Sequence, residues 1–522
     1  MSNETPAHRR RWAILAVLCL SLILVVVNNT IVNVALPTIS RELSASTRQL
    51  QWIVDAYVLV FCSLLLAMGH FGDRNGRRRA LRLGLVAFAV FSAIASRATS
   101  PGQLITASGL MGIGAALVFP ATLAVLVSVF RDRRERATAI GIWTACTGLA
   151  VALGPITGGL LLEHFWWGSV YLVNVPVALI ALAAGWFLIP DSRDPEEGRL
   201  DVVGLLLSIS GIALLVFSII EAPRHGWSSL QFIAGTIAAL ALLAVFAFWE
   251  IRSSHPLLDV RLFRRARFTA ASAAVTTAFF ALFGFIFLIT QYLQLVQGYT
   301  PLQAGVRTLP FALTTAVAAP LGIALMHRLG STVVVSGGLV LMSTGFVLAS
   351  RLQVDTPYAG LTVICMVVIA AGLGLTTSPA TESIMGALPP EKSGVGSAVN
   401  DTTRELGGTL GVAVIGSVFA SVFATRLADA LGALGVPAPV IEAATTSMTG
   451  ALVVAQQSGP SGAAIAAAAR SAFVDGLSRG SLVAAGVALL GAVLSALLLP
   501  ARHRTPDGAT TEASSDLEKV LR

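Results

Sequence analysis

The chain has 522 residues, of which 55% are hydrophobic and 12% are charged, and its mean hydropathy is +0.80. A soluble protein of this length carries about twice that charged fraction, so the composition excludes a soluble protein and predicts an all-α protein that crosses a membrane many times. The net charge of +8 does not indicate a nucleic-acid partner, because the arginines flank apolar runs, as the positive-inside rule requires.

Apolar runs of about twenty residues, long enough to cross the hydrocarbon core as a helix, recur along the chain and predict fourteen transmembrane helices. The predicted spans are 12–34, 50–68, 80–97, 104–129, 137–162, 167–189, 202–221, 231–251, 268–296, 301–326, 332–350, 358–385, 397–424 and 480–499. Basic gaps alternate with gaps that carry few basic residues. Because basic loops stay in the cytoplasm, this alternation predicts a multi-pass protein of the cell membrane with both termini cytoplasmic.

A hairpin at 69–79, between the second and third spans, is the densest cluster of charge in the chain. Its glycines permit a tight turn and close backbone approach. Its aspartate can cap the next helix or pair with an arginine across the hairpin. The residues of this hairpin that we predict to act in gating are Gly69, Gly72, Asp73, Arg74, Gly76 and Arg77.

The pattern of this hairpin, Gly-x-Phe-Gly-Asp-Arg-x-Gly-Arg-Arg-Arg, resembles the signature loop of the major facilitator superfamily, whereas an ordinary basic loop would lack the spaced glycines and aspartate. Several further stretches resemble the fourteen-helix drug:proton antiporters of that superfamily, the quaternary-ammonium and multidrug exporters. These stretches are 29–37, 51–57, 174–176, 299–310 and 404–408. The resemblance implies a major facilitator fold in which two bundles rock about a central cavity.

The fifth predicted span contains Gly154, Pro155, Gly158 and Gly159, which resemble the antiporter motif of drug exporters in this superfamily. The first glycine of that motif is replaced here by Ala150. Proline removes a backbone hydrogen bond and kinks a helix, and the glycines let neighbouring helices pack closely. We predict a conformational role for these four residues, and the alternative is a glycine-rich helix that serves packing alone.

The resemblance also implies the domain organisation. We predict a six-helix bundle over 1–190, two inserted helices over 191–251, and a second six-helix bundle over 252–500. A cytoplasmic tail follows over 501–522. Within the second bundle, 425–479 is expected to be a long outer loop rich in Ala, Gly and Ser, with an amphipathic helical hairpin as the alternative to an irregular loop, and the sequence does not indicate its role.

Two positions depart from the family pattern. Relatives usually carry an acid at the position of Asn28 in the first span and an arginine at that of Ser108 in the fourth. Losing one charge alone would leave the other uncompensated in the membrane, at a cost of about 2.5–3.5 kcal/mol on insertion scales. Losing both is consistent if the two normally pair, which is an inference from the family.

The acids that remain are the candidates for proton coupling and substrate binding. Asp55 lies inside the second span, and Asp401 and Glu405 are four residues apart on one face of the thirteenth. Burial and a neighbouring like charge both favour the protonated form of a carboxyl, so such an acid can carry a proton across or attract a cation. Arg404 is the fourth candidate. The alternatives are a structural ion pair of Arg404 with its neighbours, and a packing role for Asp55.

We therefore predict a proton-driven secondary exporter of amphipathic drugs or antibiotics, including cationic ones, that works as a monomer by alternating access in the lipid bilayer. A dedicated exporter of one natural product, such as a self-resistance pump, is the alternative. An enzyme is not expected, because the chain lacks HExxH and Gly-x-x-x-x-Gly-Lys patterns. The four cysteines lie in apolar runs without metal-ligand spacing, so we expect no metal and no cofactor. Glu221, at the end of a span, is expected to face water.

Overall fold

The computed structural model describes residues 10–130, 132–191, 201–253, 256, 258, 260–387 and 393–499. The described residues are overwhelmingly helical and include no β-strand, which confirms the predicted all-α membrane fold. Helices are the expected outcome, because a segment in hydrocarbon must satisfy its backbone polar groups within itself. The tail predicted at 501–522 lies outside the described residues.

The first part of the chain forms a group of helices that corresponds to the first six predicted spans. Its elements are α2 (Arg11–Leu43), α3 (Thr47–Asn75), α4 (Arg77–Ala95), α5 (Pro101–Val129), α6 (Arg133–His164), α7 (Ser169–Leu172) and α8 (Asn174–Leu188). Two helices and a 3-10 turn follow this first group. They are α9 (Val202–His225), α10 (Leu230–Arg252) and η1 (Val260–Arg264).

The remaining elements form the second group and include two short π-helical segments and a 3-10 turn. They are α11 (Ala266–Gln291), η2 (Tyr292–Val296), α12 (Pro301–Arg307), α13 (Leu309–Leu329), α14 (Ser331–Ala349), η3 (Tyr358–Thr362), α15 (Val363–Met385), α16 (Ser393–Ala433), α17 (Ala438–Thr445), α18 (Met448–Gln457), η5 (Gly459–Ser461) and α19 (Gly462–Leu498). Each of the fourteen predicted spans falls on a helix or on consecutive helices.

Length and hydropathy identify 11 membrane-crossing helices among the described residues, or 12 when the bent helix α3 is included as one span. The bend in α3 measures 52° and separates Thr47–Leu65 from Ala67–Asn75. The count of fourteen therefore stays a prediction. The boundaries of the predicted domains are likewise predictions.

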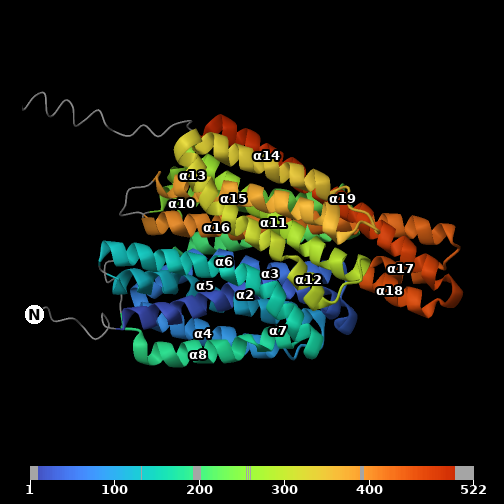
Figure 1. The fold of residues 1–522 in the computed structure, drawn as a ribbon, viewed down its shortest axis with the longest axis horizontal. Helices are drawn as coiled ribbons and strands as arrows, with labels where there is room; N and C mark the ends of the chain where they lie inside the picture. The colour runs from blue at the N-terminus through green and yellow to red at the C-terminus, as the bar shows by residue number, and fades with distance from the viewer. Residues whose placement is uncertain are drawn as a thin grey trace, which may run out of the picture.

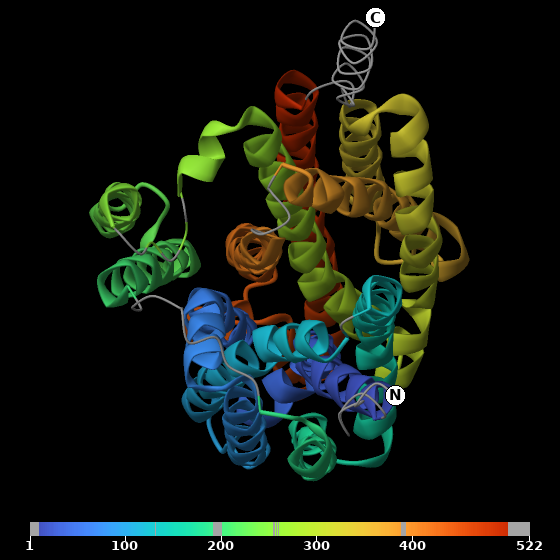
Figure 2. The ribbon, with the colours of Figure 1, turned by 90° about the vertical axis from the view of Figure 1, so that its left-hand side faces the viewer.

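The two groups of helices lie side by side and form two bundles (Figure 1). Helices α2–α8 pack on one another, and α11–α19 pack on one another. Helices α9 and α10 pair on one flank, where α9 contacts α3 of the first bundle and α16 of the second (Figure 2). Helix α16 thus lies at the boundary between the bundles, with α3 and α9 against it.

The sequence repeats itself weakly, since 320–330 echoes the 69–79 hairpin with its spaced glycines and an arginine, and glycine turns lie at equivalent places in the two stretches. Gly76 ends α3 and begins α4 with φ +108°, and Gly330 ends α13 and begins α14 with φ +87°. Backbone in this left-handed region favours glycine, because a Cβ would clash there. The turn at Gly330 follows the stretch that echoes the 69–79 hairpin, so the echo extends to backbone geometry.

The segment predicted as an outer loop at 425–479 is mostly helical. Helix α16 continues to Ala433 and α19 begins at Gly462, with α17 and α18 between them. Alanine has the highest helix propensity, which explains why this alanine-rich segment forms helices beyond the membrane. We call the end of the molecule that carries the helices α17 and α18 the hairpin end (Figure 1). The opposite end, where α2 begins, α19 ends and the separate 69–79 hairpin lies, is the termini end.

The hairpin end joins the two bundles. The backbone N–H of Thr47, at the start of α3, donates to the carbonyl oxygen of Thr446 at 3.0 Å, and its hydroxyl donates to the same oxygen at 3.2 Å. Thr446 directly follows α17 of the second bundle. The α17–α18 segment therefore rests on the first helix turn of α3.

Candidate functional site

Asp55 is sealed between α3 and α16. Its side chain is fully buried, and neither carboxyl oxygen has a hydrogen-bond partner among the described residues. One turn earlier, the Gln51 amide donates to the backbone carbonyls of Val412 and Ala413 at 3.2 Å each. One turn later, Leu59 packs in a cluster that includes Ala413. Because residues four apart share a helix face, Asp55 faces α16.

Glu405 lies in the first half of α16 and is half-buried. The side-chain amide of Asn29, on α2 of the first bundle, donates to its carboxylate at 3.4 Å. Asp401, one turn earlier and also half-buried, accepts from the side-chain amide of Asn400 at 3.4 Å. The two acids are therefore held by neutral amides, and one of these amides comes from the opposite bundle.

Arg404 makes its hydrogen bond and its ring contact with groups other than the two acids. Its guanidinium donates to the Thr381 hydroxyl at 3.4 Å and lies 5.2 Å from the ring centre of Phe279. Within the described part of the chain, it makes no ion pair with Asp401 or Glu405. The structural ion pair that the sequence left open is thus not formed in this conformation.

Asn28 and Ser108, the two departures from the family pattern, line the same small cavity, which has room for about one water molecule. The carbonyl oxygen of the Asn28 side chain accepts from Asn174 at 3.1 Å. The hydroxyls of Ser108 and Tyr171 are buried without a partner in the described ranges. The full lining is Asn28, Asn29, Val32, Ile53, Val54, Tyr57, Ser108 and Tyr171. The inferred pairing of charges at these two positions is therefore geometrically possible.

The hairpin at 69–79 is held by an ion pair. The Arg77 guanidinium donates to Asp73 at 2.5 Å, so the aspartate pairs across the turn instead of capping α4. A Cβ on Gly72 would lie 3.2 Å from that of Ala80, which explains the small residue there. Two further members of the predicted set behave differently. A Cβ on Gly69 would make only ordinary contact with Pro120, at 3.5 Å, and Arg74 is exposed.

The antiporter-like motif in α6 packs on both bundles. A Cβ on Gly154 would lie 1.9 Å from the hydroxyl of Thr30, and one on Gly158 would lie 2.8 Å from Ile31, both on α2. A Cβ on Gly159 would instead lie 2.5 Å from the Cα of Leu302 on α12, in the second bundle.

The contact between α6 and α12 is reciprocal. A Cβ on Gly305 of α12 would lie 2.3 Å from the carbonyl oxygen of Pro155. Two backbones can approach this closely only where both carry glycine. The motif therefore places α6 in direct backbone contact with the opposite bundle.

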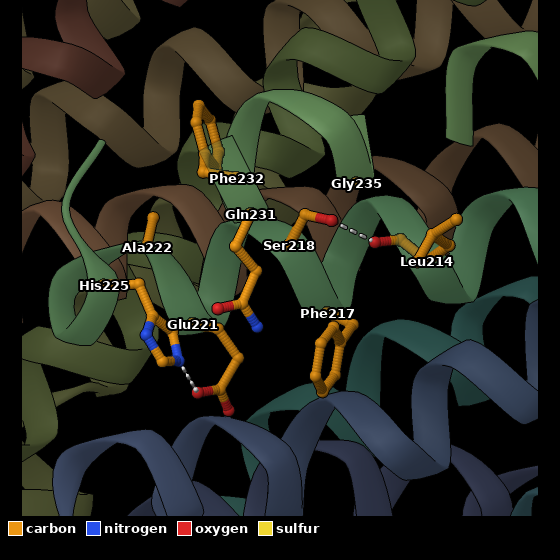
Figure 3. Close-up of a pocket in the computed structure, with 9 residues that line it drawn as sticks. All are labelled: Leu214, Phe217, Ser218, Glu221, Ala222, His225, Gln231, Phe232 and Gly235. Carbon is orange, nitrogen blue, oxygen red and sulfur yellow. Dashed lines mark hydrogen bonds and ion pairs between the residues drawn. The ribbon is translucent and has the colours of Figure 1, made fainter. Parts of the chain in front are cut away.

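Glu221 does not face water as expected. Its carboxylate accepts two hydrogen bonds from the Arg48 guanidinium, at 2.8 Å each, and only 12% of its side chain is exposed. His225 lies 3.9 Å away on the other side. Glu221 and His225 line a groove of about 150 Å³ between α9 and α10 (Figure 3). The ion pair ties the inserted helix α9 to the start of α3.

Sequence analysis missed two polar side chains of this region, Asn29 and Gln51. Both lie in stretches that carry the family resemblance, but the signal that could have singled them out is physical. A polar side chain deep in an apolar run needs a buried hydrogen-bond partner. Among the described residues, no three His, Cys, Asp or Glu side chains gather closely enough to hold a metal ion.

Comparisons with known proteins agree with this geometry. The family model described as Major Facilitator Superfamily matches residues 18–412. The chain is 36% identical over 492 residues to the multidrug efflux pump LfrA of Mycolicibacterium smegmatis, covering 94% of this chain and 97% of that protein. It is 35% identical to the methyl viologen resistance protein SmvA of Salmonella typhimurium, with 89% and 93% covered. It is 32% identical to the tetracenomycin C resistance and export protein of Streptomyces glaucescens, with 98% and 95% covered.

Among solved structures, the fold is similar to that of a bacterial homologue of the human lysosomal transporter Spinster, in an inward-facing and unoccupied conformation. The TM-score is 0.65 at 17% identity, covering 95% of this chain and 98% of the other. This likeness shows the fold alone. Together with the family model and the relatives, it confirms the predicted family: the chain belongs to the major facilitator superfamily.

Proposed function

We propose that this protein exports amphipathic drugs or antibiotics, including cationic ones, by alternating access coupled to proton entry. The observation that carries the proposal is Asp55, a fully buried carboxyl without a hydrogen-bond partner among the described residues. It lies on a helix that faces α16 across the boundary between the bundles. Proton gain or loss at this place is therefore tied to the contact between the bundles.

The physical reason is the cost of an isolated charge. A carboxylate in an apolar environment without a donor is strongly unfavourable, whereas the neutral acid is tolerated. Asp55 can release its proton readily only when the bundles separate and water or a cation reaches it. Proton exchange and bundle movement are then parts of the same step.

The second group of acids has a different role in the proposal. Asp401 and Glu405 are half-buried, so a solute at the boundary can reach them. Two carboxyls at a largely apolar boundary suit an amphipathic cation. Arg404 balances part of their charge.

The gating elements are the 69–79 hairpin, with its Asp73–Arg77 pair, and the glycine-rich segment of α6. We place the termini end in the cytoplasm of a cell-membrane protein, because the arginine-rich hairpin lies between α3 and α4 there. The protein is proposed to act as a monomer. Each proton that enters through 100 mV of membrane potential supplies about 2.3 kcal/mol for the outward step.

The test is efflux from proteoliposomes after a pH jump. Asp55→Asn keeps the shape of the side chain but cannot exchange a proton, so we expect proton-driven efflux to fall by at least about tenfold while membrane yield and thermal stability are kept. Asp475→Asn, which removes an exposed acid on α19, is the matched control and should transport like the wild type. Wild-type efflux by Asp55→Asn would contradict the proposal.

A dedicated exporter of one natural product is the second candidate, favoured by relatives named for single antibiotics. These include the tetracenomycin C protein and the puromycin resistance protein of Streptomyces alboniger, which is 34% identical over 429 residues. A susceptibility panel in a pump-deleted host separates the two candidates. Resistance to methyl viologen, puromycin and tetracenomycin C together indicates a multidrug pump, whereas resistance to one compound indicates the specialist.

A further inference from the structure

Two hydrogen bonds among the described residues join the bundles and end on an acid. The Thr300 hydroxyl donates to Glu163 at 3.4 Å near the ends of α12 and α6. The Asn29 amide donates to Glu405 and joins the middle of α2 to the first half of α16, over 376 positions of sequence. Other hydrogen bonds between the bundles, near the hairpin end, run from side-chain amides and hydroxyls to backbone carbonyl oxygens. Examples are the Gln294 amide, which donates to the Val34 carbonyl at 2.9 Å, and the Thr47–Thr446 contact.

We infer that Asn29 is a positioning residue for proton coupling: its amide holds Glu405 across the boundary between the bundles and stabilises the carboxylate form only in the conformation that brings these two side chains together. The inference deepens the proposed function and rests on it. A hydrogen bond from an N–H group to a carboxylate is stronger than one to the neutral acid. Breaking the contact therefore makes proton binding to Glu405 more favourable.

The surroundings of Glu405 single out Asn29 as the group that changes with bundle movement. Asp401 and Arg404 are the charged groups nearest to Glu405, and both travel with it on α16. Tyr57 and Cys62, on α3 of the first bundle, lie near enough to Glu405 to interact with it electrostatically. The Tyr57 hydroxyl is already used, since it donates to the Val25 carbonyl at 3.1 Å. Asn29 is the group of the first bundle that donates to Glu405 in the described ranges.

Two features of the first bundle surround Asn29: a hydrogen bond within α2 and a small polar cavity. The Asn33 amide, one turn later, donates to the backbone carbonyl of Asn29 at 3.1 Å. The side chain of Asn29 also borders the small polar cavity with Asn28 and Ser108, and its carbonyl oxygen is buried without a partner in the described part of the chain. A carbonyl oxygen directed at a polar cavity with room for a water molecule favours the orientation in which the amide nitrogen faces Glu405.

The test measures the proton on Glu405 directly. In an infrared pH titration of the purified protein, the carboxylic C=O band that disappears in Glu405→Gln reports the protonated acid. Asn29→Ala should move the midpoint of this band to higher pH by about half a unit or more, because the donor to the carboxylate is lost. Asn29→Gln, which keeps an amide, should restore part of the shift. Ser21→Ala is the matched control on α2, since Ser21 is buried and bonds only within its own helix.

A double-mutant comparison gives the second measurement. The pH at which efflux is half-maximal should rise in Asn29→Ala but be unaffected by that change in a Glu405→Gln background. An unshifted Glu405 band in folded Asn29→Ala overturns the inference, and so does an efflux shift that persists without Glu405. If the wild type shows no proton-coupled efflux at all, the proposed function fails, whereas the infrared result still decides the role of Asn29.

Discussion

At the scale of single residues, the three candidate acids lie in two kinds of environment. Asp55 is sealed and unpartnered, whereas Asp401 and Glu405 are half-buried and accept hydrogen bonds from amides. An unpartnered acid is favoured as the neutral form, and an amide-bonded acid tolerates charge. The residues therefore divide into one acid that is sealed from solvent and two half-buried acids that a proton or a cation can reach.

The cavity shared by Asn28 and Ser108 leads to a prediction for these residues. Asn28→Asp alone places an uncompensated carboxyl in a buried site, and we expect lower membrane yield and efflux from a cost of about 2.5–3.5 kcal/mol. Adding Ser108→Arg should recover much of the loss, because both side chains reach the same cavity. Membrane yield and efflux in proteoliposomes check both variants. Equal yield and efflux for the single and double variants would rule out the pairing.

Helix α6 connects the bundles at the level of secondary-structure elements. Gly154 and Gly158 face α2 of its own bundle, and Gly159 faces α12 of the other. One short glycine-rich segment thus contacts both its own bundle and the opposite one, and alternating access would have to break only the second contact. The backbone approach of Gly159 and Gly305 makes this second contact tight in the conformation described.

Gly159→Val should prevent that closure. The new side chain would clash with the backbone of Leu302, because a Cβ at this position already comes within 2.5 Å of it. This clash should hold α6 and α12 apart, so we expect efflux to fall by about tenfold or more. Gly141→Val is the matched control on α6, because no described atom beyond its own helix lies within 4 Å of a Cβ there. Spin-label distances between the two helices check the prediction. An unchanged distance together with normal efflux in Gly159→Val would contradict it.

At the scale of the whole molecule, contacts from several elements hold the two bundles and helix α9 together at the hairpin end. The Thr47–Thr446 bonds, the Arg48–Glu221 pair and the α6–α12 contact all lie near that end. In alternating access, the bundles must separate there to release substrate. The inserted helix α9 and the α17–α18 segment would then take part in the cycle rather than only surround it.

A disulfide across this end tests the movement. Oxidising Thr47→Cys with Thr446→Cys should reduce efflux to background, because the bundles can no longer separate, and a reductant should restore it. The native cysteines are buried or half-buried and can be replaced by serine. The control pair, Arg426→Cys with Asp475→Cys, crosslinks α16 to α19 within one bundle and should leave efflux unchanged. Full efflux by a quantitatively crosslinked Thr47–Thr446 variant would show that this end does not open.

Much of this molecule follows from local sequence. Apolar runs of membrane length can only be helices in hydrocarbon, so the positions of the spans could be predicted from composition and spacing, and the motifs from their resemblance to the family. The 425–479 segment was expected to be an outer loop with a helical hairpin as the alternative, and its helices follow from the high helix propensity of alanine. Asp55, Asp401 and Glu405 could be chosen because acids in apolar runs are rare and functional.

Tertiary structure decided which partners these residues have. The sequence could not show that Arg404 turns to Thr381, that Glu221 pairs with Arg48, or that Asn29 reaches Glu405. Such contacts depend on the rotation and packing of helices that are far apart in the chain, and a small turn of a helix moves a side chain to another neighbour. The amino-acid sequence by itself therefore determined the membrane helices and the acids they carry, whereas packing between bundles decided which acids are paired.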